Sequence, residues 1–155
     1  MSKCNENDLS KRGPDHPQQQ AYQDTVADYS TTSPDGDNVK EDVPCDASVA
    51  VGDVVRMNGT TAVRAVATSF ANSNAVGIVI SKPTATTCDI AVCGPVTLGA
   101  LSPLDTGEQY FLSDTTSGAL TDTPPTTSGN YVIRIGNAIN NTTITLKIER
   151  VVKRA

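Results

Sequence analysis

The sequence predicts an all-β protein: a compact antiparallel β-sandwich or barrel, preceded by a long extended N-terminal arm. Residues 46–155 consist of short runs of Val, Ile, Leu and Thr that Gly, Pro, Asn and Asp interrupt at nearly even spacing. No helical pattern separates these runs, which favours paired strands over a mixed α/β fold. Residues 1–45 hold too few apolar residues to build a core. We therefore divide the chain into an arm, 1–45, and a β module, 46–155.

The arm contains one weak helical pattern, over residues 18–28. Its apolar residues are too sparse for a helix that is stable in isolation. Tyr22, Val26 and Tyr29 have no place in a core, so we interpret them as anchors that become ordered against a partner. A disordered leader is the alternative interpretation.

The first strands of the module are predicted around a hairpin. Asn58-Gly59 is the strongest short hairpin signal in the chain, and strands are expected on either side, at residues 54–57 and 61–68. Residues 75–80 form a continuous apolar run of strand length. This run predicts a central strand that is buried on both faces.

The middle of the module continues in the same way. Strands are predicted at residues 87–92, 96–98 and 109–113, followed by a hairpin that bends at Ser117-Gly118. Pro124-Pro125 predicts a loop or an extended segment, because proline cannot donate a hydrogen bond to a strand ladder.

Two further strands are predicted near the C-terminus. Residues 131–136 form one, with Gly136 as a candidate bulge. The clearest pattern lies at residues 143–149, where Ile144, Leu146 and Ile148 alternate with polar residues. This alternation predicts a strand with one buried and one solvated face.

Charge and hydropathy argue against two classes of partner. The net charge is −5 and the isoelectric point is near 4.7, so the chain has no general attraction for nucleic acid or anionic lipid. We interpret the basic cluster at residues 149–154 as a solvated end or a charge-guarded edge strand. No stretch approaches the ~20 apolar residues of a membrane helix. Residues 1–7 lack the apolar centre of a signal peptide, so we expect the chain to be made and kept in the cytoplasm, unless it leaves inside a larger assembly.

The sequence predicts no enzyme, and no catalytic, cofactor-binding or metal-binding residues. His16 is the only histidine and lies in the arm, so no nucleophile–base pair can be assembled around it. The stretch 35–38 resembles a calcium loop, but its glycine comes too early and no glutamate closes the loop. A carboxylate pair for glycoside cleavage remains open, although the acids of the module lie at predicted turns or strand edges.

The four cysteines, Cys4, Cys45, Cys88 and Cys93, are expected to be reduced in a cytosolic protein. Cys88 and Cys93 lie five positions apart in one predicted strand and face opposite sides, so they cannot pair within it. Cys4 and Cys45 lie at the two ends of the arm. A disulfide between them, or from one of them to a neighbouring subunit, is a further hypothesis for a particle that meets oxidising surroundings.

Few aromatic residues are available for ligand binding. The chain has no Trp. A carbohydrate-binding module would need an exposed aromatic platform, which we expect only Tyr110, Phe111 and Tyr131 could supply. Such a module is the alternative function from another class.

Short motifs follow one another in an order that resembles a known group of proteins. They are 45–47 (Cys-Asp-Ala), 51–55 (Val-Gly-Asp-Val-Val), 75–79 (Ala-Val-Gly-Ile-Val), 81–87 (Ser-Lys-Pro-Thr-Ala-Thr-Thr), 94–96 (Gly-Pro-Val), 107–113 (Gly-Glu-Gln-Tyr-Phe-Leu-Ser), 117–121 (Ser-Gly-Ala-Leu-Thr) and 135–138 (Ile-Gly-Asn-Ala). This series resembles the small β modules of tailed-bacteriophage virion proteins, among them capsid decoration proteins, head fibres and tail-fibre segments. The resemblance covers residues 45–149.

The resemblance implies a non-enzymatic structural part of the virion, commonly a homotrimer, and it carries over no catalytic residues. We expect a decoration or cement protein on the capsid surface whose arm binds the major capsid protein or another virion protein. A tail or neck adaptor, or a fibre-anchoring protein, is the alternative. The absence of a long fibre shaft from the sequence favours the capsid.

Overall fold

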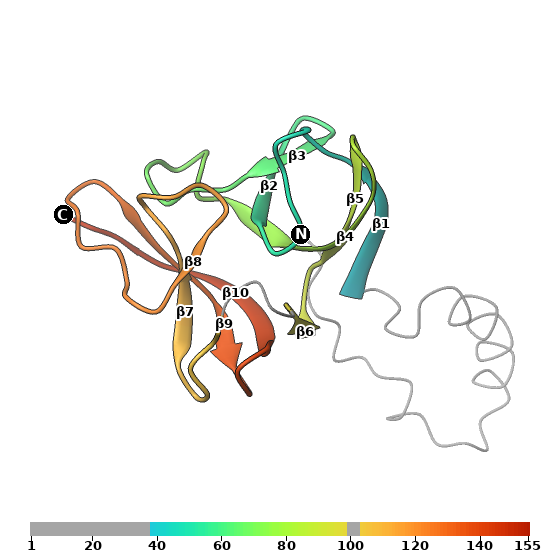
Figure 1. Ribbon diagram of the computed structural model, residues 1–155. Helices are drawn as coiled ribbons and strands as arrows, with labels where there is room; N and C mark the ends of the chain where they lie inside the picture. Colours follow the sequence, from blue (N-terminus) through green and yellow to red (C-terminus); the bar gives the residue numbers. More distant parts are fainter. Residues whose placement is uncertain (1–37, 99–102) are drawn as a thin grey trace, which may run out of the picture.

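The computed structural model describes residues 38–98 and 103–155, which form ten β-strands in two five-stranded antiparallel sheets (Figure 1). The prediction of an all-β fold is confirmed. No helix in this part of the chain is long and apolar enough to cross a membrane.

The two sheets divide the chain at about residue 93. Sheet A has the strand order β1 (Val39–Pro44), β5 (Thr87–Ala91), β4 (Ala75–Thr84), β2 (Val54–Asn58) and β3 (Thr61–Arg64). Sheet B has the order β6 (Gly94–Thr97), β10 (Thr143–Lys153), β9 (Tyr131–Ala138), β7 (Gln109–Leu112) and β8 (Leu120–Thr121).

The predicted hairpin joins β2 to β3. Asn58 pairs with Thr61, and Gly59 occupies the first loop position with φ of +62°. A side chain at that φ would be strained, which explains why a glycine stands there. The hairpin aligns Val55 of β2 with Arg64 of β3.

Most of the core lies between the two sheets. Buried residues from sheet A, among them Val54 and Ile78, pack there with residues from sheet B, among them Leu112, Ile135 and Ile144. These side chains are aliphatic, as expected of a chain without Trp. The sandwich part of the fold prediction is therefore confirmed.

Sheet A also curls toward a barrel. Its two edge strands approach each other where Cys45, just after β1, bridges Ala62 of β3, and Asp46 N donates a hydrogen bond of 2.9 Å to Ala62 O. Figure 1 shows β1 to β5 arranged as a ring. A second buried cluster fills the interior of this ring: Cys45, Val49, Val55, Ala62, Val79, Cys88 and Ile90.

Strand β4 is buried on both faces, as its continuous apolar run predicts. Ile78 belongs to the core between the sheets, whereas Val79 belongs to the barrel interior, and neither side chain is exposed. Strand β10 confirms the predicted alternation at Ile144 and Leu146, and it continues to Lys153 through two irregularities in its pairing with β9.

Gly136 lies at a bulge, as expected. Tyr110 of β7 pairs with Gly136 of β9, but the next residue, Phe111, pairs with Arg134, so β9 has one extra residue at this point.

Residues 39–45 belong to the module, although their composition placed them in the arm. β1 is the edge strand of sheet A, and its central residues Lys40, Glu41 and Asp42 are exposed. An edge strand tolerates such charges and is protected by them from pairing with other chains. The sequence of β1 is therefore polar, and its composition resembles that of the arm. Residues 1–37 of the arm, including the helical pattern at 18–28, lie outside the described residues.

Candidate functional site

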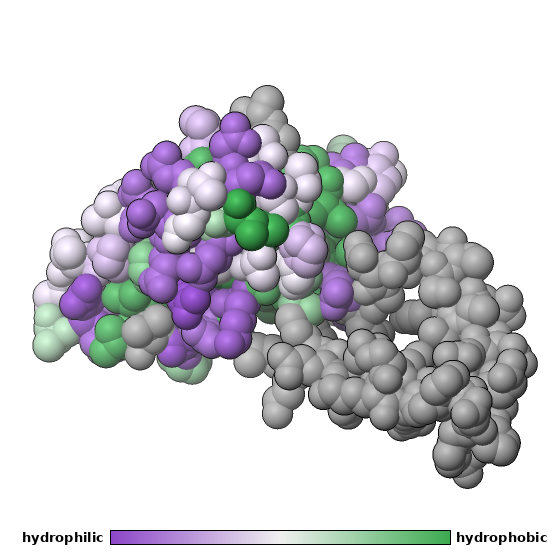
Figure 2. Space-filling model, turned by 90° about the horizontal axis from the view of Figure 1, so that it is seen from below, coloured by the Kyte–Doolittle hydropathy of each residue, from purple (hydrophilic) through white to green (hydrophobic). Residues whose placement is uncertain are grey.

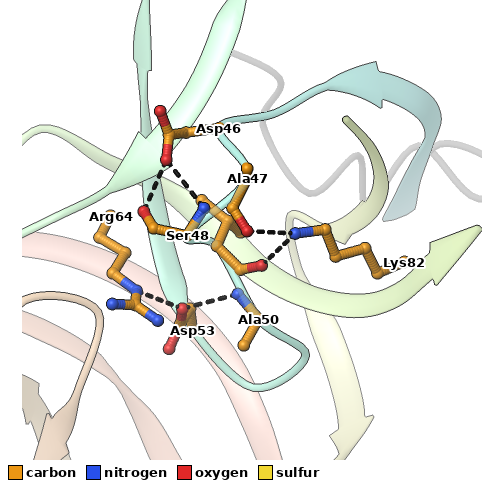
Figure 3. A network of polar contacts seen from close by, with 8 residues as sticks. Asp46, Ala47, Ser48, Ala50, Asp53, Arg64 and Lys82 are labelled. Carbon is orange, nitrogen blue, oxygen red and sulfur yellow. Dashed lines mark hydrogen bonds and ion pairs between the residues drawn. The ribbon is translucent and has the colours of Figure 1, made fainter. Parts of the chain in front are cut away.

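A network of polar contacts fixes the loop between β1 and β2, which covers one end of the barrel (Figure 3). Lys82 of β4 donates hydrogen bonds from Nζ to Ala47 O at 2.9 Å and to Val49 O at 2.5 Å. The side chain of Val49, which is 2% exposed, enters the barrel interior. The Lys82 ammonium group thus hydrogen-bonds to the backbone of the loop.

Two carboxylates complete this network. Asp53 Oδ2 accepts from Arg64 Nε at 2.6 Å and from Ala50 N at 2.8 Å. Asp46 Oδ1 accepts from the backbone N and the Oγ of Ser48. The two Ser48 hydrogen bonds hold the pKa of Asp46 below its usual value. Asp46 is therefore expected to be ionised, and both carboxylates are hydrogen-bonded to the loop.

The Ser48 hydroxyl lies 2.6 Å from Asp46 Oδ1, but the lowered pKa of Asp46 makes this carboxylate a weaker base. Across residues 38–98 and 103–155, no group of three or more His, Cys, Asp and Glu side chains could hold a metal ion. We interpret the network as structural.

Two thiols meet inside the barrel. Cys45 and Cys88 are free and buried, and burial together with a hydrogen bond to Cys45 raises the pKa of Cys88 to about 12. A thiol with such a pKa is not a nucleophile at neutral pH. The hypothesised disulfide between Cys4 and Cys45 is not formed, because Cys45 is a free thiol buried in the barrel interior. Cys4 lies outside the described residues.

The raised pKa of Cys88 predicts a loss of stability at alkaline pH. The folded protein holds the Cys88 proton from the ordinary pKa of 9.0 up to about 12, whereas the unfolded chain releases it. The free energy of unfolding should therefore be unaffected below pH 9 and should fall above it, by as much as about 1.4 kcal/mol per pH unit. Urea unfolding of wild type and Cys88→Ala from pH 7 to 10.5 measures the difference in slope. Equal slopes would contradict the prediction.

A pocket of about 280 Å³ lies near the start of β1. It is lined by Asn38, Val39, Ile80, Ala91, Cys93, Pro95, Val96 and Thr97. The lining is mostly apolar and has no charged side chain. Val92 N donates a hydrogen bond of 2.8 Å to Asn38 O, which holds the start of β1 against the segment between β5 and β6. Cys93 is disulfide-bonded, so the expectation that all four cysteines are reduced is wrong.

An aromatic–basic patch, which we define as Phe70, Tyr131 and Arg150, is the second surface feature. The Arg150 guanidinium lies 4.2 Å from the centre of the Phe70 ring and 5.7 Å from that of Tyr131. The two rings are 6.3 Å apart in an edge-to-face arrangement. Phe70 is 64% exposed. Such contacts stabilise a fixed arrangement of exposed side chains.

Hydrophobic residues are otherwise scattered on the surface. On the face seen in Figure 2, hydrophilic and neutral residues predominate and hydrophobic ones show as separate patches among them. Isolated exposed apolar residues are normal for a soluble domain. The aromatic–basic patch differs because its side chains are ordered by contacts with one another.

The three aromatic residues expected for a sugar platform do not form one. Tyr110 is 6% exposed, and its hydroxyl accepts a hydrogen bond from Asp105 N at 2.9 Å. Phe111 is only partly exposed. Tyr131 instead belongs to the aromatic–basic patch, where its ring meets that of Phe70. Sequence reasoning did not select Phe70, which lies in the connection between β3 and β4. The predicted anchors Tyr22, Val26 and Tyr29, and also His16, lie outside the described residues.

No family model, no curated protein and no solved structure matches this chain.

Proposed function

We propose that this chain is a structural virion protein of a tailed bacteriophage, one that decorates or cements the capsid through its N-terminal arm. The observation that carries the proposal is the division of the chain. A compact β module, without an acid–base or metal-binding set among the described residues, follows a polar arm that contains Tyr22, Val26 and Tyr29. The order of short motifs that resembles phage β modules supports the same conclusion.

The arm is the attachment element in this proposal. Its anchors contact the major capsid protein or another virion protein, since tyrosines are well suited to dominate such contacts. A polar segment that orders on binding can cover a long seam between subunits. Many weak contacts summed over a homo-oligomer, with a trimer favoured, then give tight attachment.

The position of β1 supports this role of the arm. β1 is an edge strand that is hydrogen-bonded to β5, and Cys45 just after it bridges β3. The arm therefore joins the module at a strand that is fixed at both ends of its length, rather than at a loose loop.

Cosedimentation with purified phage heads tests the proposal. We expect the full chain to bind heads saturably at high copy number, and a chain of residues 38–155, which keeps β1, to lose most of this binding. The triple variant Tyr22→Ser, Val26→Ser, Tyr29→Ser should lose at least about tenfold in affinity, as for a set of hot-spot residues. Substituting Gln18, Gln19 and Gln20 with Ser is the matched control and should change little.

Two other outcomes would replace the proposal. Binding only to isolated tails, at a few copies per particle, would identify a tail or neck adaptor. Binding to neither, combined with a signal on a glycan array, would identify a carbohydrate-binding module. We favour this module less because the Arg150 guanidinium covers one face of the exposed Phe70 ring, the type of surface on which a sugar stacks.

A further inference from the structure

The aromatic–basic patch has the composition of a protein-binding surface. Phe70 is the most exposed of the large hydrophobic side chains in the described part of the chain. Arg150 stacks on it and Tyr131 meets it edge-on, so the three side chains are held in place before any partner arrives. Aromatic residues and arginine dominate binding energy at interfaces, and side chains ordered in advance lose little entropy on binding.

The patch is positively charged. Lys153 is exposed and lies directly opposite Tyr131 in the β9–β10 ladder. The nearby acid, Glu149, is paired with Arg134 at 3.2 Å and with Lys147 at 3.3 Å. The positive charge of Arg150 and Lys153 is therefore left for a partner that carries negative charge.

The arm of this same protein has the complementary composition. Residues 13–37 contain five Asp and no Lys, Arg or Glu. The predicted anchors Tyr22, Val26 and Tyr29 lie among these acids, next to Asp24 and Asp28. The segment thus combines negative charge with aromatic and apolar side chains, which suits a surface made of arginine, lysine and aromatic rings.

The position of the arm favours binding to the patch of a second copy over binding to the patch of the same chain. The arm joins the module at Asn38, before β1, whereas the patch includes β10 close to the C-terminus. In Figure 1, β1 and the C-terminus lie on opposite sides of the module. A neighbouring copy can present its arm to the patch without crossing the module.

We propose that the aromatic–basic patch of one copy binds the acidic, tyrosine-bearing segment 13–37 of a second copy. Tyr22 and Tyr29 pack against Phe70 and Tyr131, and Asp24 and Asp28 pair with Arg150 and Lys153. The contact joins two different surfaces of the protein, so it closes into a ring, such as a trimer, or continues as a chain of copies.

This inference rests on the proposed function for its biological setting and deepens it by naming a second copy as a partner of the arm. On a particle, the high local concentration of copies would strengthen the contact. Its test uses the purified protein alone, so its failure would leave attachment to heads unaffected, and failure to bind heads would leave this contact unaffected.

Sedimentation velocity of the full chain over a concentration series tests the proposal. We expect reversible association that weakens when NaCl is raised from about 50 to 500 mM, because screening reduces the attraction between the arm and the patch. Phe70→Ser and Arg150→Gln should each weaken association at least about tenfold. Ile139→Ser is the matched control, because Ile139 is 55% exposed in the β9–β10 connection, and it should have no effect.

A mixing experiment identifies the two surfaces. Phe70→Ser keeps an intact arm, and the double variant Tyr22→Ser, Tyr29→Ser keeps an intact patch. We expect each variant alone to stay monomeric and an equimolar mixture to form heterodimers. A wild type that is monomeric at all concentrations, association unchanged by Phe70→Ser, or a mixture without heterodimers would overturn the proposal. Thermal unfolding that matches wild type shows that Phe70→Ser is folded.

Discussion

Replacing Gly77 with alanine is expected to remove much of the stability of the module. A Cβ at Gly77 would lie 2.2 Å from Ala91 O and 2.6 Å from Ile90 Cγ2. The first of these atoms belongs to the backbone of β5, so β5 would have to move away from β4, its partner in sheet A. Overpacking of a core costs about 1–3 kcal/mol and occasionally more. We expect the upper end of this range, because the obstructing atom is backbone.

Urea denaturation measures this loss, and Gly59→Ala is the matched control. A Cβ at Gly59 meets nothing within 4 Å, but the residue has φ of +62°. That variant should lose only about 1 kcal/mol, the cost of a side chain in the left-handed region. A Gly77→Ala protein no less stable than Gly59→Ala would show that the β4–β5 ladder can shift at little cost.

Truncating Ile78 to alanine is expected to have the second large effect. The side chain is fully buried between the two sheets, where it packs in the same cluster as Leu112, Ile135 and Ile144. Ile→Ala substitutions in a core cost about 2–5 kcal/mol, since apolar contact is lost and a cavity remains. For a domain of this size the loss lowers the midpoint of thermal unfolding by roughly 10 °C or more.

Val51→Ala provides the comparison for Ile78→Ala. Val51 is 39% exposed, so its truncation should change the unfolding free energy by less than about 0.5 kcal/mol. Similar losses in the two variants would mean that the contact between sheets A and B contributes little to stability.

Local sequence patterns predicted the strands well, because each of these patterns involves residues that are neighbours in the sequence. Asn58-Gly59 encodes the hairpin, and the alternation at residues 143–149 encodes a half-buried strand. The continuous run at 75–80 predicted burial on two faces, and it is buried on one side by sheet B and on the other by the barrel interior.

Features that depend on distant residues were not readable from the sequence. β1 is held by its ladder to β5, and its exposed residues Lys40, Glu41 and Asp42 carry no pattern of burial. The approach of Cys45 to Cys88 depends on how sheet A curls, because the two are 43 positions apart in the chain. The contact of Phe70 with Arg150 joins the β3–β4 connection to β10 of sheet B, and the two residues are 80 positions apart in the chain.

The strand that closes the barrel is also the strand that follows the arm, and this has a mechanical consequence. Tension applied along the arm reaches the module at Val39, which pairs with Ala91 at the end of the β1–β5 ladder. The load falls first on that ladder and then on the bridge between Cys45 and Ala62. Within the described residues, β1 is hydrogen-bonded to no strand of sheet B. A sufficient pull would therefore open the barrel along its seam while the sandwich still holds.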